Sequence, residues 1–166
     1  MTEIRQAVTD AEIDEVARLA DFIWHEHFAK ILTVAQIDYM LDRFLSAAAL
    51  QKAIREDGYE YYLVRHGGDT VGFIGIRPED KKLFLSKLYL KKSSRGQGFA
   101  TEMLAFVMTR AKVLGAEEVY LTCNKYNDNT LAIYRHWGFV TTDSVVTDIG
   151  GGYVMDDYIM AKAVEA

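Results

Sequence analysis

The stretch Arg95-Gly96-Gln97-Gly98-Phe99-Ala100 decides the fold, because it joins a strand pattern to a helix pattern. An apolar, strand-like run at residues 83–90 precedes it, and apolar residues recur at helical spacing over residues 101–114 behind it. In a glycine turn between a strand and a helix, successive backbone N–H groups point at an anion, and the helix dipole adds partial positive charge. A side chain in place of either glycine would keep phosphate oxygens away from that backbone. We therefore expect this turn to hold the diphosphate of a phosphorylated cofactor.

The length and composition of the chain predict one domain with an ordinary hydrophobic core. Its 166 residues are 50% apolar and 12% aromatic, which fits a single domain spanning residues 1–166. The net charge of −5 argues against a nucleic-acid partner, because such a partner normally requires a basic face.

The charge is distributed unevenly along the chain. Residues 81–135 hold ten Lys and Arg against four Asp and Glu, whereas residues 1–80 hold eight against fifteen and residues 136–166 hold one against five. A basic centre between acidic flanks suits a phosphate-bearing cofactor in the middle and a cationic substrate beside it. A solvated surface would produce acidic flanks equally well, so the charge pattern alone leaves the substrate open.

The sequence offers little for redox or metal chemistry. Cys123 is the only cysteine, so there is no internal disulfide, and its apolar neighbours favour a small core residue over a nucleophile. Four scattered histidines have no ligand-like spacing, and we expect no metal. The N-terminus has no signal-peptide layout and no apolar run reaches the ~18 residues that span a bilayer. We therefore expect a cytoplasmic protein without a membrane partner.

Helix-start patterns predict three helices in the first third of the chain, after a short strand at residues 3–8. Thr9-x-x-Glu12 has the pattern of a capping box, and Thr33-x-x-Gln36 repeats it. A third, alanine-rich helical piece at residues 47–56 ends at Asp57-Gly58, where glycine permits a left-handed stop.

Strand patterns predominate in the rest of the chain. The β-rich runs at residues 59–66 and 70–77 flank the tight turn Gly67-Gly68-Asp69, which predicts a hairpin. The elements expected after the hairpin are a strand at 83–90, a helix at 101–114, a strand at 118–123, a helix at 129–136, and strands at 138–147 and 153–162. This order predicts an α+β fold: a mixed, mostly antiparallel central sheet flanked by helices, with parallel pairing where the helix 101–114 crosses over.

Two common phosphate-binding motifs fit the glycine turn poorly. A nucleotide P-loop needs Lys followed by Ser or Thr after its last glycine, but Phe99-Ala100 stands there. A dinucleotide fingerprint needs a third small residue, and Thr101 is a poor match. It also needs an acid at the end of the next strand, whereas Glu117 and Glu118 open that strand.

A third interpretation explains more, because two motifs together resemble the GCN5-related N-acetyltransferase (GNAT) superfamily. Arg95-x-x-Gly98-x-Ala100 fits the pattern Arg/Gln-x-x-Gly-x-Gly/Ala, and Asn127 is followed seven residues later by Tyr134 and then by Gly138-Phe139. The resemblance covers essentially the whole expected element order and is closest in look to bacterial polyamine-type acetyltransferases. It implies the fold of that superfamily, with acetyl-CoA as co-substrate and a β-α crossover that binds it.

The resemblance assigns most cofactor contacts to the main chain. A bulge in the strand before the turn would let Leu88, Tyr89 and Leu90 bind the pantetheine arm, and one amide there would polarise the thioester carbonyl. Arg95 could attract the phosphates or could equally be an ordinary solvated charge. The diphosphate would rest on the backbone N–H groups of Gly96, Gln97, Gly98, Phe99, Ala100 and Thr101. Asn127 would bind the pantetheine amides from the opposite wall, or alternatively would only cap the following helix.

Tyr134 matches the general acid of the superfamily. Attack of an amine on the thioester must expel coenzyme A as a thiolate, and a phenol with a pKa near ~10 can protonate it. A core tyrosine packed with Trp137 and Phe139 is the alternative. The base stays open: the ribosomal-protein branch of the superfamily has a glutamate five residues before the motif asparagine, where this chain has Thr122. Water chains leading to His25, Glu26 or Glu60 could serve instead.

The segment at residues 22–28 matches the wall of the acceptor site in the superfamily, between the first two helices. Trp24 could stack on a cation, with His25 and Glu26 beside it, or the segment could be a helix end with Trp24 in the core. We expect an enzyme that acetylates a small cationic amine such as a polyamine. The alternatives are a peptide amine as acceptor, or a non-catalytic acyl-CoA sensor. A homodimer through the strand 153–162 is also possible.

Overall fold

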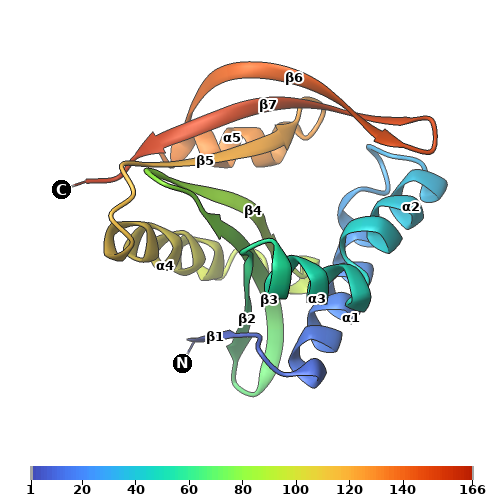
Figure 1. The fold of residues 1–166 in the computed structure, drawn as a ribbon, viewed down its shortest axis with the longest axis horizontal. Coiled ribbons are helices and arrows are strands. Elements are labelled where there is room, and N and C mark those ends of the chain that lie inside the picture. Colours follow the sequence, from blue (N-terminus) through green and yellow to red (C-terminus); the bar gives the residue numbers. More distant parts are fainter. Residues whose placement is uncertain (1, 166) are drawn as a thin grey trace. The chain divides into compact units, whose positions relative to one another are not determined.

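The computed structural model describes residues 2–165, which form five α-helices, one short 3₁₀ helix and seven strands (Figure 1). The elements in chain order are β1 Thr2–Gln6, α1 Asp10–His27, α2 Val34–Phe44, α3 Ala47–Glu56, β2 Glu60–His66, β3 Asp69–Pro78, β4 Lys82–Leu90, η1 Lys92–Ser94, α4 Phe99–Val113, β5 Glu118–Asn124, α5 Asp128–His136, β6 Val140–Gly150 and β7 Tyr153–Ala163.

The strands form a seven-stranded sheet in the order β1-β2-β3-β4-β5-β7-β6. The pairs β1–β2, β2–β3, β5–β7 and β6–β7 are antiparallel, whereas β4 and β5 are parallel where Lys82–Phe84 meets Glu118–Tyr120. The predicted α+β class, with a mostly antiparallel sheet and one parallel crossover, is therefore confirmed.

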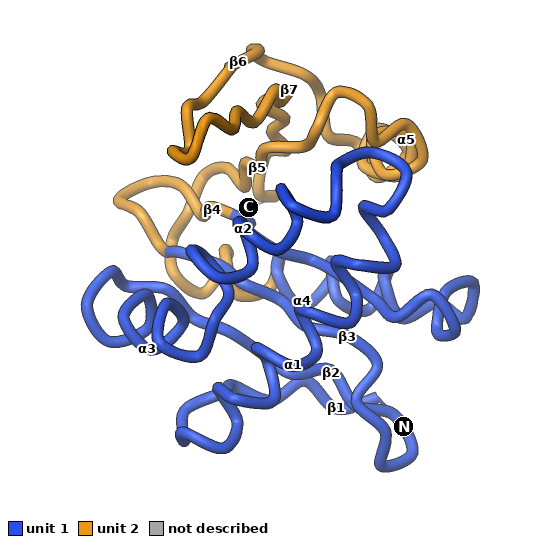
Figure 2. The backbone as a smooth tube through the Cα atoms, turned by 90° about the vertical axis from the view of Figure 1, so that its right-hand side faces the viewer, with its two compact units in different colours: residues 1–77, 85–107 blue, residues 78–84, 108–166 orange. Residues whose placement is uncertain are grey.

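The chain divides into two compact units (Figure 2). The first comprises residues 1–77 and 85–107, and the second comprises residues 78–84 and 108–166. Strand β4 and helix α4 each contribute residues to both units. The glycine turn belongs to the first unit, and the segment from Asn127 to Phe139 belongs to the second. The single domain expected from the length stays a prediction.

The predicted caps begin the first two helices. The Thr9 hydroxyl accepts a hydrogen bond from Glu12 N at 3.2 Å. In turn, the Glu12 carboxylate accepts one from Thr9 N at 3.0 Å, and the two bonds form the capping box. Thr33 caps α2 by accepting from Gln36 N at 3.1 Å. Helix α1 is longer than expected, because it continues to His27 and has Phe28 as its C-cap. The segment at 22–28 is thus the end of α1 rather than a connection between helices.

Helices cover both faces of the first unit's sheet. Tyr62 packs its ring 4.8 Å from that of Phe106 on α4, while the neighbouring Tyr61 points to the opposite face because side chains alternate along a strand. On that opposite face, Phe73 lies 5.7 Å from Tyr89. Tyr89 also contacts Trp24 of α1 at 5.8 Å, so α1 covers this face.

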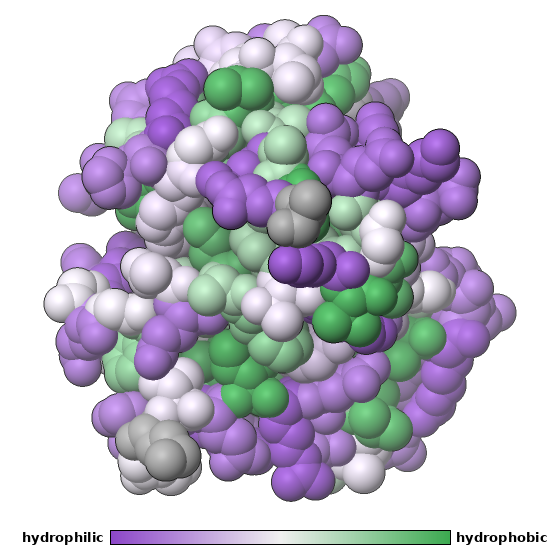
Figure 3. Space-filling view, turned by 90° about the vertical axis from the view of Figure 1, so that its left-hand side faces the viewer, coloured by the Kyte–Doolittle hydropathy of each residue, from purple (hydrophilic) through white to green (hydrophobic). Residues whose placement is uncertain are grey.

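Strand β7 lies inside the sheet of the second unit. It pairs with β5 along one side and with β6 along the other. A homodimer through the strand 153–162 requires that strand to be a free edge of the sheet, and this requirement is not met, because β6 is the outer strand. The face drawn in Figure 3 mixes hydrophobic side chains with hydrophilic ones.

Candidate active site

The glycine turn has the backbone geometry of an anion-binding helix start. Gly96 and Gly98 have φ values of +77° and +86°, and a Cβ at either position would meet nothing within 4 Å. Both glycines therefore allow the chain to turn and also leave open space above it. At the start of α4, the backbone N–H of Glu102 donates a hydrogen bond to the Gly98 carbonyl at 3.2 Å. The N–H groups of Phe99, Ala100 and Thr101 precede it and have no helical acceptor.

The C-terminal end of α1 holds the segment that leads into the turn. Glu26 accepts a hydrogen bond from the backbone N–H of Lys92 at 2.6 Å. The Arg95 guanidinium donates to Nδ1 of His27 at 3.0 Å. Glu26 thus helps to position the loop. The sequence alone indicated only an acceptor-site residue or a base.

Burial, together with the contact to Arg95, favours the neutral form of His27. Burial, and next the positive charge of Arg95, lower its pKa from 6.5 to about 4. An arginine has donors only, so the ring nitrogen that it contacts must be an acceptor. The neutral imidazole therefore orients the first residue of the glycine motif.

An aromatic cluster lies beneath the end of β4. Tyr89 contacts Trp24, His27, Phe28 and Phe73 with ring centroids between 5.6 and 6.1 Å apart. Trp24 is only 4% exposed, and its ring packs 4.9 Å from that of Phe28. Its ring is therefore largely committed to protein contacts, as in the core alternative considered for the sequence.

The contacts of β4 indicate an irregularity just before the turn. Tyr61 pairs with Gly75 and so shares a face with Phe73, and the Tyr61 hydroxyl is hydrogen-bonded to Ser86. Tyr89 contacts Phe73 on that same face. Regular alternation would place Ser86 and Tyr89 on opposite faces, because three positions separate them. We infer one extra residue between them, as in a β-bulge, in the segment that the resemblance assigns to pantetheine.

The other acceptor-site and base candidates of the first unit also have partners. His25 contacts Asp38 Oδ1 through Nε2 at 2.6 Å and the Asp21 carbonyl through Nδ1 at 2.7 Å. These hydrogen bonds raise its pKa, with the larger effect from Asp21. Glu60 accepts a hydrogen bond from the Tyr62 hydroxyl at 2.5 Å. His25 thus joins α1 to α2, and Glu60 is fixed along its own strand.

In the second unit, two asparagines follow β5 and take different roles. Asn124 accepts a hydrogen bond from Tyr126 N through its side chain at 2.9 Å, which makes a local turn. Asn127 occupies the N-cap position of α5, but its side chain makes no capping hydrogen bond, and the residue is 7% exposed. The capping alternative for Asn127 is therefore not what the structure shows.

Tyr134 projects from α5 into an aromatic group with Trp137 and Phe139, at centroid distances of 5.8 and 5.4 Å. The residue is 7% exposed, and no hydrogen bond of its hydroxyl is found within residues 2–165. Burial, and to a smaller extent the neighbouring Cys123, raise the pKa of Tyr134 above the ordinary phenol value. The hydroxyl therefore stays protonated around neutral pH and can donate.

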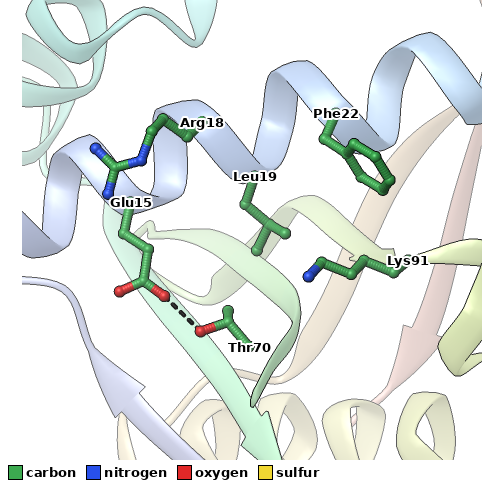
Figure 4. A pocket seen from close by; sticks show the side chains of 6 residues that line it. All are labelled: Glu15, Arg18, Leu19, Phe22, Thr70 and Lys91. Atoms are coloured by element: carbon green, nitrogen blue, oxygen red, sulfur yellow. Dashed lines mark hydrogen bonds between the residues drawn. The ribbon is translucent and has the colours of Figure 1, made fainter.

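The first unit also contains a cavity of about 250 Å³ between α1 and β3 (Figure 4). It is lined by Glu15, Arg18, Leu19, Phe22, Thr70 and Lys91. Glu15 accepts hydrogen bonds from Thr70 and, at 2.7 Å, from Arg65. This network ties α1 to the β2–β3 hairpin, so we interpret the polar end of the cavity as structural.

Within residues 2–165, no group of three or more His, Cys, Asp or Glu side chains could hold a metal ion. Over the same residues, no helix combines the length and the apolar character needed to cross a membrane. Cys123 is buried, and this burial raises the pKa of its thiol to about 12. A thiol of that pKa is a poor nucleophile at neutral pH, in line with the core role expected from the sequence.

Comparison with known proteins identifies the family. The model of the acetyltransferase (GNAT) family matches residues 17–139, so the chain belongs to this family. An uncharacterised N-acetyltransferase of Mycobacterium bovis is 28% identical over 156 residues, which cover 93% of this chain and 98% of that protein. One from Escherichia coli is 30% identical over 98 residues, covering 57% of this chain and 59% of that protein, which is less than two thirds of its length.

Solved structures show the same fold. The PaiA N-acetyltransferase of Thermoplasma acidophilum in complex with coenzyme A has a TM-score of 0.81 at 20% identity, covering 98% of this chain and 99% of that one. A GCN5-related N-acetyltransferase of Rhodopseudomonas palustris has a TM-score of 0.80 at 16% identity, covering 98% and 96%. Family membership makes this chain an acyltransferase with N-acetyltransferase chemistry.

Proposed function

We propose that this enzyme transfers an acetyl group from acetyl-CoA to the primary amine of a small cationic molecule, by direct attack in a ternary complex. One observation carries the proposal: the helix start after Gly98 presents N–H groups without helical acceptors beside two glycines that leave open space. Such a site fits a diphosphate and needs no metal.

The cofactor would be held mostly by the main chain. The N–H groups from Gly96 to Thr101 would bind the diphosphate, with Arg95 oriented by His27 beside them. The irregular end of β4, at residues 88–90, would offer backbone groups to the pantetheine arm. Asn127, at the N-terminal end of α5, would contribute its amide. The bound cofactor supplies the activated acyl group, and the chain supplies position and proton transfer.

Tyr134 would donate the proton that the departing sulfur needs. Its hydroxyl is protonated at neutral pH and makes no hydrogen bond within residues 2–165, so it can bond to a ligand. Its raised pKa makes it a weaker acid than an exposed phenol, so a large part of its contribution would be a hydrogen bond to the developing thiolate.

The acceptor is proposed from charge. Acidic residues outnumber basic ones in residues 1–80 and 136–166, and Asp157 is a buried carboxylate in the second unit. Both favour a cationic amine over an anionic one. Polyamines are the first class to test, and the N-terminal amines of peptides are the second.

A thiol-release assay tests the function. Acetyl-CoA is mixed with the enzyme and with spermidine, with monoamines or with short peptides, and free coenzyme A is measured. We expect release that depends on the amine and is fastest with the polyamine. Turnover of peptides without turnover of polyamines would contradict the acceptor class. Binding of acetyl-CoA without release for any amine would contradict the catalytic proposal.

A further inference from the structure

The end of β5 brings a buried carboxylate to the same place as the acid candidate. Asp157 on β7 is 7% exposed and pairs with Asn124, the last residue of β5. Three residues after Asn124 comes Asn127, which begins the helix that carries Tyr134. The second unit alone therefore places Asp157 and Asn127 near the end of β5, with Tyr134 on the helix that follows. Strands β5 and β7 and helix α5 can be followed in Figure 1.

Asp157 and Tyr134 lie on opposite faces of β5. Leu121 and Cys123 are buried on one face, and Tyr134 is close enough to Cys123 for that thiol to raise its pKa. Asn124 points to the other face, because side chains alternate along the strand. Its cross-strand partner Asp157 shares that face.

Asp157 lies between two uncharged neighbours in the sheet, with charged groups near them. Its two neighbours in the sheet are Asn124 on β5 and Val145 on β6. Burial and next the charge of Asp157 raise the pKa of the Cys123 thiol, while Arg135 on α5 acts to lower it, so both charges lie near the C-terminal end of β5. The adjacent Asp156 points to the other face and pairs with Lys125 at 2.8 Å. Burying a carboxylate costs free energy, so a site that retains one is a candidate for proton transfer.

We infer that Asp157 is the general base that accepts a proton from the substrate ammonium group, on the face of β5 opposite to Tyr134. The inference rests on the proposed function. Asp157 takes this proton and passes it to solvent, and the neutral amine nitrogen then forms a bond to the acyl carbon and loses its second proton to the same carboxylate. The carbon–sulfur bond breaks, the sulfur receives a proton from the Tyr134 hydroxyl, and solvent reprotonates Tyr134. The amine nitrogen and the sulfur are bonded to the same carbon, so the adduct would lie at the end of β5, where groups from both faces of the strand can meet it.

The test measures kcat/KM for spermidine between pH 6 and pH 10 in the wild type, Asp157→Asn and Asp157→Glu. Loss of a general base costs roughly 100-fold or more, so we expect Asp157→Asn to fall by about that factor at pH 7. The defect should shrink towards pH 10, because the substrate amine then loses its proton to solvent near its own pKa of about 10. Asp157→Glu should keep the wild-type shape of the profile at a lower rate.

Asp156→Asn is the matched control, since it removes the neighbouring carboxylate from the other face, and we expect near wild-type kinetics. Each variant is checked for acetyl-CoA affinity and for thermal unfolding. An Asp157→Asn defect that is constant with pH, or one confined to KM, would overturn the inference and leave the proposed function intact. A wild type that releases no coenzyme A with any amine would overturn both.

Discussion

The guanidinium of Arg95 donates a hydrogen bond to Nδ1 of His27 at 3.0 Å, which ties the glycine motif to the last turn of α1. This contact links the end of α1 to a turn that is distant in the sequence. Glu26, the neighbour of His27, binds the backbone N–H of Lys92 at 2.6 Å. These two hydrogen bonds engage the end of α1 in holding the segment that leads into the glycine turn.

The first prediction concerns acid stability. The pKa of His27 is about 4 in the folded chain against 6.5 ordinarily, so between these values the unfolded chain binds a proton that the folded chain does not. The free energy of unfolding therefore falls as the pH drops from 6.5 to 4. We expect this contribution to be of order 1–3 kcal/mol, since partial exposure weakens it.

His27→Gln should remove that pH dependence, because a glutamine carbonyl can accept from Arg95 and is neutral at every pH. Urea unfolding of both proteins at pH 7, 5.5 and 4.5 checks this. The stability difference between them should narrow, or reverse in favour of the variant, as the pH falls. Parallel stability curves would contradict the assigned protonation state.

The second prediction concerns His25, whose contribution to stability depends on pH in the opposite direction to that of His27. Hydrogen bonds to the Asp21 carbonyl and to Asp38 raise the pKa of His25, so its stabilising effect is complete below the ordinary value of 6.5 and is lost as the pH rises through the raised value. Asp38→Asn should lower the melting temperature slightly at pH 5.5, with a smaller effect at pH 9. Because both side chains are more than a third exposed, we expect at most about 1 kcal/mol. An equal loss at both pH values would argue for a role in packing only.

A third prediction tests the support of the loop. Glu26→Ala removes the acceptor of the Lys92 N–H and should weaken acetyl-CoA binding by about three- to tenfold, roughly the free energy of one charged hydrogen bond. The rate with saturating cofactor should stay within twofold of wild type. Glu56→Ala, at the exposed end of α3, is the control for loss of a negative charge. A large fall in kcat with unchanged acetyl-CoA affinity would contradict this role and would assign Glu26 to acceptor binding or to catalysis.

A fourth prediction concerns the acid. Tyr134→Phe removes a hydroxyl that makes no hydrogen bond within residues 2–165, so the free energy of unfolding should change by less than about 0.5 kcal/mol. We expect kcat to fall by about 100-fold or more while the Kd for acetyl-CoA stays within twofold. Tyr126→Phe is a suitable control, since that ring is 69% exposed. Near wild-type kcat in Tyr134→Phe would assign the residue to the core alone.

The sequence predicted those features of the fold that depend on local chemistry. The capping box at Thr9, the helix at residues 47–56 and the glycine turn at Gly67-Gly68 all form as expected, because caps and left-handed turns depend on neighbouring residues. The position of the strand 153–162, inside the sheet rather than at a free edge, could not be predicted in this way. Strand order depends on pairing between distant segments, which no local pattern reveals.

In the candidate site, too, local motifs could be predicted from the sequence, whereas contacts between distant residues could not. The motif residues around Gly98 and Tyr134 could be found by their spacing, but the partners of His25 and Glu26 could not, since Asp38 and Lys92 are distant in the chain. Asp157 was missed as well, because it stands within an ordinary strand pattern. Only its pairing with Asn124 reveals its position at the end of β5.

The most direct test is calorimetric titration of acetyl-CoA into the wild type, Gly98→Ala and Gly68→Ala. Both glycines have a φ of +86° and open space around a Cβ, so each alanine introduces a similar backbone strain of about 1–2 kcal/mol, but only Gly98 lies in the loop. We predict that the wild type binds one acetyl-CoA per chain, that Gly98→Ala weakens binding at least tenfold, and that Gly68→Ala leaves it unchanged. Folded wild type that takes up no acetyl-CoA at millimolar concentration, or a Gly98→Ala protein that binds as tightly as wild type, would contradict the account.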